Sequence, residues 1–193
     1  INNPFFDSDT NGKIDLKSEY NFGFSLDAAK RDYGVSDLSI DFTQSIFSSF
    51  LRGRTLIHNQ SGIETILVER DNIIRDWEKV IAATLIHFLN RVISDMDTLY
   101  SSDFLAGPLS EFSIEYNSNW SNMRSLVIAL QYNDLKQISD SDLLIIVQAI
   151  GETPIHPIDG TIIFNNYQNI LMNTVKNIIQ NTYNFSILHM EEW

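Results

Sequence analysis

Residues 61–96 read SGIETILVERDNIIRDWEKVIAATLIHFLNRVISDM, and this stretch decides the fold class. Its apolar residues recur three and four positions apart, and neither Gly nor Pro occurs in it after Gly62. Such spacing is typical of an amphipathic helix with one buried face. At about 1.5 Å per residue, the stretch predicts one helix on the order of 50 Å long or two helices in sequence.

Other segments of the chain have the same apolar spacing. We expect helices over residues 25–34, 41–58, 108–130, 139–151 and 161–183. Ser25 and Ser139 are suitable N-caps, Pro108 suits the first turn of a helix, and Gly34 and Gly151 suit its end. These signals predict where the helices begin and end.

The fold class that follows is all-α, a helical bundle with long amphipathic helices. A strand interpretation stays open for Leu143–Ile150 and Thr161–Phe164, because both are rich in β-branched residues. Segment length and capping favour helices in both places. We therefore expect a helical bundle domain over residues 25–193, preceded by a separate segment over residues 1–24.

Composition limits the classes of function. The 193 residues are 44% hydrophobic, enough to bury a core as one domain or one tight pair of subdomains. The formal net charge of -12 disfavours nucleic acid and anionic lipid as partners. The chain has no Cys, which excludes disulfides, Cys-ligated metals and a thiol nucleophile. The longest apolar runs, such as Leu143–Val147, predict no transmembrane segment.

An acidic stretch near the start of the sequence resembles a calcium-binding loop. Residues 7–15 read DSDTNGKID, which matches the first nine positions of an EF-hand loop, with Gly12 at the sharp turn. Position twelve is Ser18 rather than Glu, but Glu19 follows it directly. The expected Ca²⁺ ligands are Asp7, Asp9, Asn11, the Lys13 carbonyl, Asp15 and Glu19. The alternative is an Asx-type turn without metal.

Four stretches resemble a known family. They are Leu26–Val35 (LDAAKRDYGV), Phe50–Ile57 (FLRGRTLI), Trp77–Asn90 (WEKVIAATLIHFLN), and Trp120–Arg124 together with Leu130–Asn133. In order and spacing they are similar to the imelysin-like cell-envelope proteins of Bacteroidetes type, which are catalogued as a domain of unknown function. The resemblance implies an all-helical bundle and export to the periplasm or the outer cell surface, often as a lipoprotein. It also implies a link to iron or haem uptake. The chain begins at Ile1 without an initiator Met, which we interpret as a processed product or a fragment.

Departures from the family pattern concern its metal-binding positions. Ala28 follows Asp27 where the family has an Asp-Glu pair, and Asn122 follows Ser121 where it has an acidic residue. The Gly-x-His-x-x-Glu run of imelysins does not occur in the sequence. We therefore expect a non-enzymatic binding domain, whose partner is a ligand or an envelope protein that the sequence does not identify.

Little else in the sequence indicates catalysis. The four His residues form no i, i+4 pair, and no nucleophile elbow, phosphate loop or dinucleotide motif is present. The alternative to a binding domain is a metal-dependent enzyme whose site includes His87 and Glu78, near Asn90, although a hydrogen-bonded structural His87 is favoured. A calcium sensor that exposes an apolar groove is a third possibility. Arg52 and Arg54 flank Gly53, which indicates either close helix packing or a contact with an anion. We favour packing with an ion pair to an acidic neighbour, because an anion site usually needs several converging donors.

Overall fold

The computed structural model describes residues 24–34, 38–102, 107–111 and 113–193. These residues form helices joined by turns, and their only β pairing is an isolated bridge between Tyr33 and Ile40. The all-α prediction is confirmed for this part of the chain. The chain divides into two compact units, Ile1–Val80 and Ile81–Trp193, and the boundary falls within one long helix.

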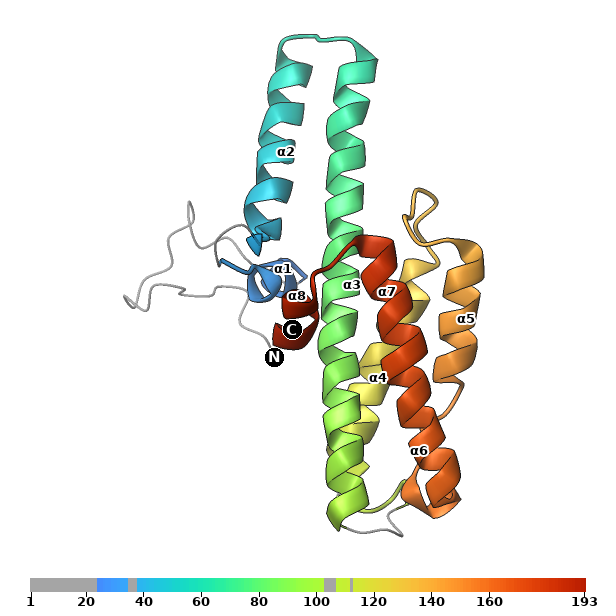
Figure 1. Ribbon diagram of the computed structural model, residues 1–193. Helices are drawn as coiled ribbons and strands as arrows, with labels where there is room; N and C mark the ends of the chain where they lie inside the picture. Colours follow the sequence, from blue (N-terminus) through green and yellow to red (C-terminus); the bar gives the residue numbers. More distant parts are fainter. Residues whose placement is uncertain (1–23, 35–37, 103–106, 112) are drawn as a thin grey trace, which may run out of the picture. The chain divides into compact units, whose positions relative to one another are not determined.

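The amino-terminal unit contains α1 (Ser25–Arg31), α2 (Phe42–His58) and the first part of α3 (Ile63–Ser102). Two carboxylates fix the start of α2. Asp41 is its N-cap and accepts a 2.7 Å hydrogen bond from the Gln44 amide, while Asp32 accepts a 2.6 Å bond from the Phe42 amide. After His58 the chain turns at Gln60, whose φ is 53°, and α3 runs back alongside α2 (Figure 1). The two helices form an antiparallel hairpin.

The carboxy-terminal unit is built around the second part of α3. It also contains α4 (Ser113–Leu130), α5 (Asp140–Ile150), α6 (Thr161–Ile170), α7 (Lys176–Tyr183) and α8 (Ile187–Glu192). A short 3-10 helix, η2 (Pro157–Asp159), precedes α6, and a π turn, η3 (Leu171–Val175), joins α6 to α7. The core consists of fully buried side chains from α3, α4, α5, η3 and α7, including Leu85, Leu89, Met96, Met123, Ile146, Leu171 and Ile179.

Most predicted helix bounds are confirmed. The stretch from 61 onward forms one helix rather than two, α2 ends at His58, and α5 has Ser139 as its N-cap and Gly151, with φ of 78°, after its last turn. The strand interpretation is wrong, since Leu143–Ile150 and Thr161–Phe164 are both helical. No helix in the described part of the chain is long and apolar enough to cross a membrane.

Three expectations about helix ends are wrong. Ser25 is the first helical residue of α1 rather than its N-cap, and α1 ends at Arg31, before Gly34. Pro108 does not begin α4, which starts at Ser113, because residues 107–110 close a turn in which the Ser110 amide bonds to the Gly107 carbonyl. Leu109 lies in that turn and is 99% exposed.

Helix α8 and the Trp193 that follows it are packed into the carboxy-terminal unit. Met190 and Trp193 are buried, and the Trp193 ring stacks on His189 with centroids 5.3 Å apart. Ser186 caps α8 by accepting a hydrogen bond from the His189 amide. Burial of two large apolar side chains holds this short helix in place, although its length alone would leave it marginal.

Candidate functional site

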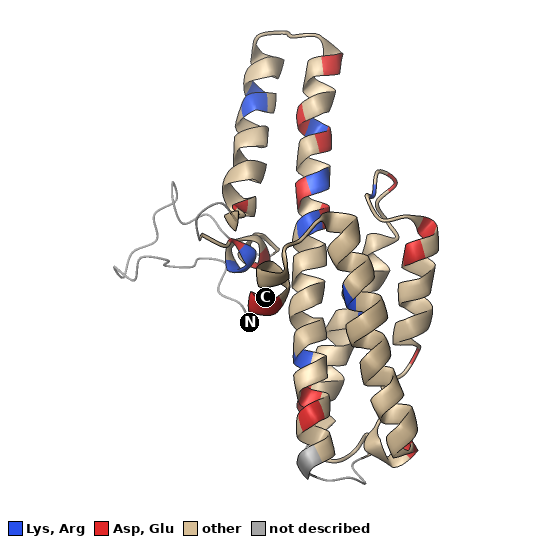
Figure 2. Ribbon diagram, in the orientation of Figure 1, with Lys and Arg blue, Asp and Glu red and all other residues tan. Residues whose placement is uncertain are grey.

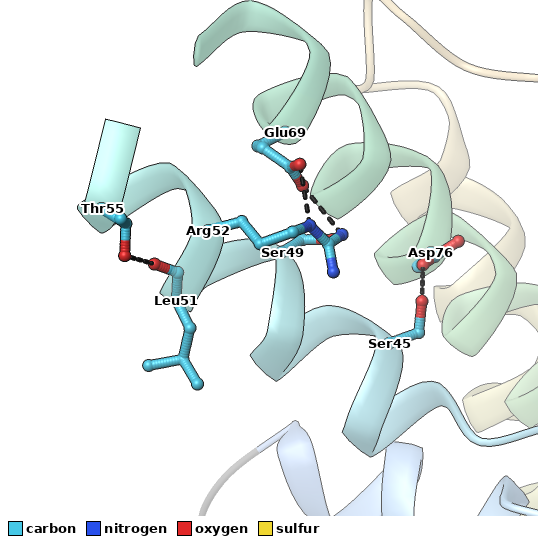
Figure 3. Close-up of polar contacts among 7 residues, drawn as sticks. All are labelled: Ser45, Ser49, Leu51, Arg52, Thr55, Glu69 and Asp76. Atoms are coloured by element: carbon cyan, nitrogen blue, oxygen red, sulfur yellow. Dashed lines mark hydrogen bonds and ion pairs between the residues drawn. The ribbon is translucent and has the colours of Figure 1, made fainter. Parts of the chain in front are cut away.

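Polar contacts join α2 to α3 at two positions along the hairpin. Arg52 donates from Nε and Nη2 to the two carboxylate oxygens of Glu69, at 2.8 and 2.9 Å (Figure 3). This bidentate pair lowers the pKa of the Glu69 carboxyl. Closer to the start of α2, Ser45 donates a 2.5 Å hydrogen bond to buried Asp76. The two pairs set the register of α2 against α3.

Gly53 lies between the helices, next to the ion pair. A Cβ atom built on Gly53 would lie 3.7 Å from the Cβ of Glu69, which is van der Waals contact. The close packing and the ion pair expected around Arg52 and Gly53 are therefore both confirmed. Arg54, on the other side of Gly53, forms no ion pair with any described residue. It lines a groove on the surface of the hairpin.

A groove of about 470 Å³ runs along one side of the hairpin. Its apolar lining comes from Phe50 and Ile57 on α2 and from Ile66, Ile73 and Ile74 on α3. Phe50 is 54% exposed and Ile57 is 62% exposed, so much apolar surface faces solvent at the rim. The lining contains two cations, Arg54 and Arg70, and one carboxylate, Glu69. Glu69 is bound by Arg52, and Arg70 pairs with Asp71, which lies outside the lining. Arg54 has no ion-pair partner among the described residues.

The charge of the hairpin differs from that of the remaining chain. Residues 42–80 contain five Lys or Arg and five Asp or Glu, whereas residues 81–193 contain four and twelve. Figure 2 shows the basic segments of the hairpin on α2 and on the first part of α3. The hairpin is thus close to neutral within an acidic chain, and its groove carries Arg54 and Arg70.

His87, the centre of the alternative enzyme site, takes part in contacts between helices. His87 Nδ1 lies 3.3 Å from the Trp193 main-chain oxygen, and Asn90 donates to the Met190 carbonyl at 2.9 Å. Lys176 donates to the Asn90 side-chain oxygen at 2.8 Å. These contacts fasten α8 and α7 to α3, as the favoured interpretation of His87 predicted.

The described part of the chain contains no cluster of candidate metal ligands. No group of three or more His, Asp and Glu residues there could hold a metal ion, so the metal-dependent enzyme receives no support from His87 and Glu78. His156 is also buried, with its ring 5.3 Å from that of Tyr116, and burial lowers its pKa. The expected Ca²⁺ ligands Asp7, Asp9, Asn11, Lys13, Asp15 and Glu19 all lie outside the described residues.

Trp120 and Tyr167 belong to the core. The buried Trp120 indole donates a 2.7 Å hydrogen bond to the Tyr167 hydroxyl, which in turn donates to the Ile150 carbonyl at 2.9 Å. Burial is the main reason why the pKa of Tyr167 is raised to about 12. Trp77 is half-buried and packs its ring 5.7 Å from that of Phe24. None of these rings forms a ligand cage in the described structure.

The groove was not predicted from the sequence. A signal was present, because Phe50 and Ile57 are seven residues apart, as are Ile66 and Ile73. These residues were assigned to a buried helix face, which is the usual position of such residues. Comparisons with protein families, with curated proteins and with solved structures give no match to this chain.

Proposed function

We propose that this chain is a non-catalytic binding domain and that the α2–α3 groove is its docking site for a helix of another protein. The observation that carries the proposal is the open apolar lining formed by Phe50, Ile57, Ile66 and Ile73. Contiguous apolar surface rimmed by charged residues is typical of interaction sites. The described residues contain no competing cluster of metal-ligating side chains.

The lining favours a helix over an extended peptide. One common way for an extended peptide to bind is to add a strand to the edge of a sheet, and the described part of the chain has no sheet. Two antiparallel helices instead leave a groove into which the side-chain ridge of a third helix fits. The seven-residue spacing on both walls matches a helix that presents an apolar residue every two turns.

The groove can be tested with two matched double variants. We expect Phe50→Ser with Ile57→Ser to weaken binding of helical peptides, selected on the parent protein from a displayed library, by at least about tenfold. Both side chains are more than half exposed, so the fold should persist. The control is Val68→Ser with Ile162→Ser, which removes two apolar residues outside the groove that are also more than half exposed. Failure to select any helical binder, or equal binding to both double variants, would refute the groove.

The cell-envelope context is part of the same proposal. Its support is the resemblance of four stretches, among them Phe50–Ile57 in α2, to the imelysin-like proteins. On that basis we propose an exported domain with a link to iron or haem uptake. Export would place it in a compartment where calcium is available to the loop of residues 7–15.

A structural calcium ion in that loop is the second part of the proposal. Its support is the spacing of Asp7, Asp9, Asn11 and Asp15 around Gly12. We expect calcium to give heat in isothermal titration and to raise the melting temperature, and Asp7→Ala with Asp9→Ala to abolish both effects. The control is Asp134→Ala with Glu152→Ala, which removes two exposed carboxylates elsewhere. No heat and no thermal shift in the parent protein would remove the calcium site.

A further inference from the structure

We infer that the helix docked in the α2–α3 groove is acidic, with Asp or Glu side chains that meet Arg54 and Arg70. This inference rests on the proposed function, because it specifies the partner of the same groove. It concerns the class of partner, an amphipathic helix with carboxylates beside its apolar stripe.

The same three-residue pattern occurs on both walls of the groove. On α2, Phe50 is followed by Arg54 four residues later and by Ile57 three residues after that. On α3, Ile66, Arg70 and Ile73 have identical spacing. All six residues line the groove. Each wall therefore presents one guanidinium between two apolar residues, one turn of helix from each.

Neither guanidinium is neutralised by the groove itself. Among the described residues Arg54 has no ion-pair partner, and Arg70 pairs at 2.6 Å only with its exposed neighbour Asp71. Asp71 does not line the groove, and Glu69, the one carboxylate that does, is held by Arg52. An exposed pair such as Arg70 with Asp71 contributes little stability, so a docked carboxylate can replace it.

A docked helix would cover both guanidiniums with apolar surface. Burying a cation without a partner is unfavourable, so a helix with only apolar or basic residues along this stripe would lose affinity. A carboxylate on the docked helix supplies the missing partner and a planar, bidentate hydrogen-bonding geometry. Charges beyond about 8 Å are screened at physiological salt, so the groove residues outweigh the acidic remainder of the chain.

A second copy of the chain fits this groove less well. A symmetric pairing of two hairpins would place each groove against its own copy. Arg54 and Arg70 would then face two further arginines, and the carboxylate of Glu69 is already engaged by Arg52 on both sides. An acidic helix from a different protein meets no such repulsion.

The test uses two synthetic helical peptides about 20 residues long. Both have Leu every seven residues, and the flanking charged positions are Glu in one and Lys in the other. At physiological salt, where the acidic remainder of the chain is screened, we expect the Glu peptide to bind the parent protein at least about tenfold more tightly than the Lys peptide in fluorescence anisotropy. Arg54→Glu with Arg70→Glu should reverse the preference, while Arg91→Glu with Arg124→Glu, the same change in net charge outside the groove, should preserve it.

The outcomes separate the partner class from the docking site. If both peptides bind equally and Phe50→Ser with Ile57→Ser abolishes binding, the groove stands and the acidic partner is wrong. If neither peptide binds, both the groove and the acidic partner are wrong. Vesicles of anionic phospholipid that displace the Glu peptide would also overturn the inference, because they would identify a lipid surface as the ligand. A preference for Glu that persists in Arg54→Glu with Arg70→Glu contradicts the assigned arginines.

Discussion

Leu89→Ala is expected to lower the free energy of unfolding by about 2–5 kcal/mol. Leu89 lies on α3 in the carboxy-terminal unit and is 0% exposed. Its truncation removes buried methyl groups and leaves a cavity in a core to which α3, α4, α5 and α7 all contribute fully buried side chains. Urea unfolding followed by circular dichroism at 222 nm measures the loss directly.

The matched control for Leu89→Ala is Ile162→Ala on α6. Ile162 is 77% exposed, so its truncation should change the free energy of unfolding by no more than about 0.5 kcal/mol. The two substitutions remove apolar atoms from the same unit and differ in burial. Equal effects of the two would contradict the assignment of this face of α3 to the core.

Tyr167→Phe is expected to lower the free energy of unfolding by about 2–4 kcal/mol. The lost hydroxyl both accepts from Trp120 Nε1 and donates to the Ile150 carbonyl, so its removal leaves a buried donor and a buried acceptor without partners. The ring itself is retained, which separates the polar contribution from packing. Urea unfolding of the parent protein and the variant gives the difference.

Tyr116→Phe serves as the comparison for Tyr167→Phe. The Tyr116 hydroxyl makes a single 2.7 Å hydrogen bond to the Ile155 carbonyl, so its removal orphans one group and should cost about 1–2 kcal/mol. Both rings are buried, and both substitutions remove one oxygen. A cost for Tyr167→Phe no larger than that for Tyr116→Phe would mean that Trp120 and Ile150 find other partners.

Helix identity was predictable from this sequence because it depends on local signals. The apolar spacing from Ile63 onward, the cap at Ser139 and the stop at Gly151 all act within a few residues of one another. Local signals failed where two of them compete. Pro108 suits a first helical turn as well as a tight turn, and the turn forms, with Ser113 Oγ donating to the Gly107 carbonyl at its end.

Features that depend on distant residues were not predictable. The π turn at Leu171–Val175 lies between Gln168, which donates to Asp97, and Lys176, which donates to Asn90. These contacts to α3 span more than 70 residues of sequence. The short α8 likewise depends on burial of Met190 and Trp193. Apolar spacing predicts a buried face but does not reveal which elements cover it.

The groove illustrates the same limit for the candidate site. The sequence indicated apolar faces on both helices of the hairpin and an ion pair near Gly53. The register of α2 against α3 decides that Phe50, Ile57, Ile66 and Ile73 face one groove. That register is set by Arg52 and Glu69, which are seventeen residues apart in sequence. The calcium loop depends on local spacing alone, and it stays a prediction because its residues lie outside the described structure.

Photo-crosslinking from the groove tests the docking site most directly. A photoreactive phenylalanine analogue is placed at Phe50, inside the groove, or at Val68, which is exposed on α3 outside it. We predict that the Glu peptide crosslinks efficiently from position 50 and only at background level from position 68. Equal yields from the two positions, or crosslinking from position 68 alone, would contradict docking in the α2–α3 groove.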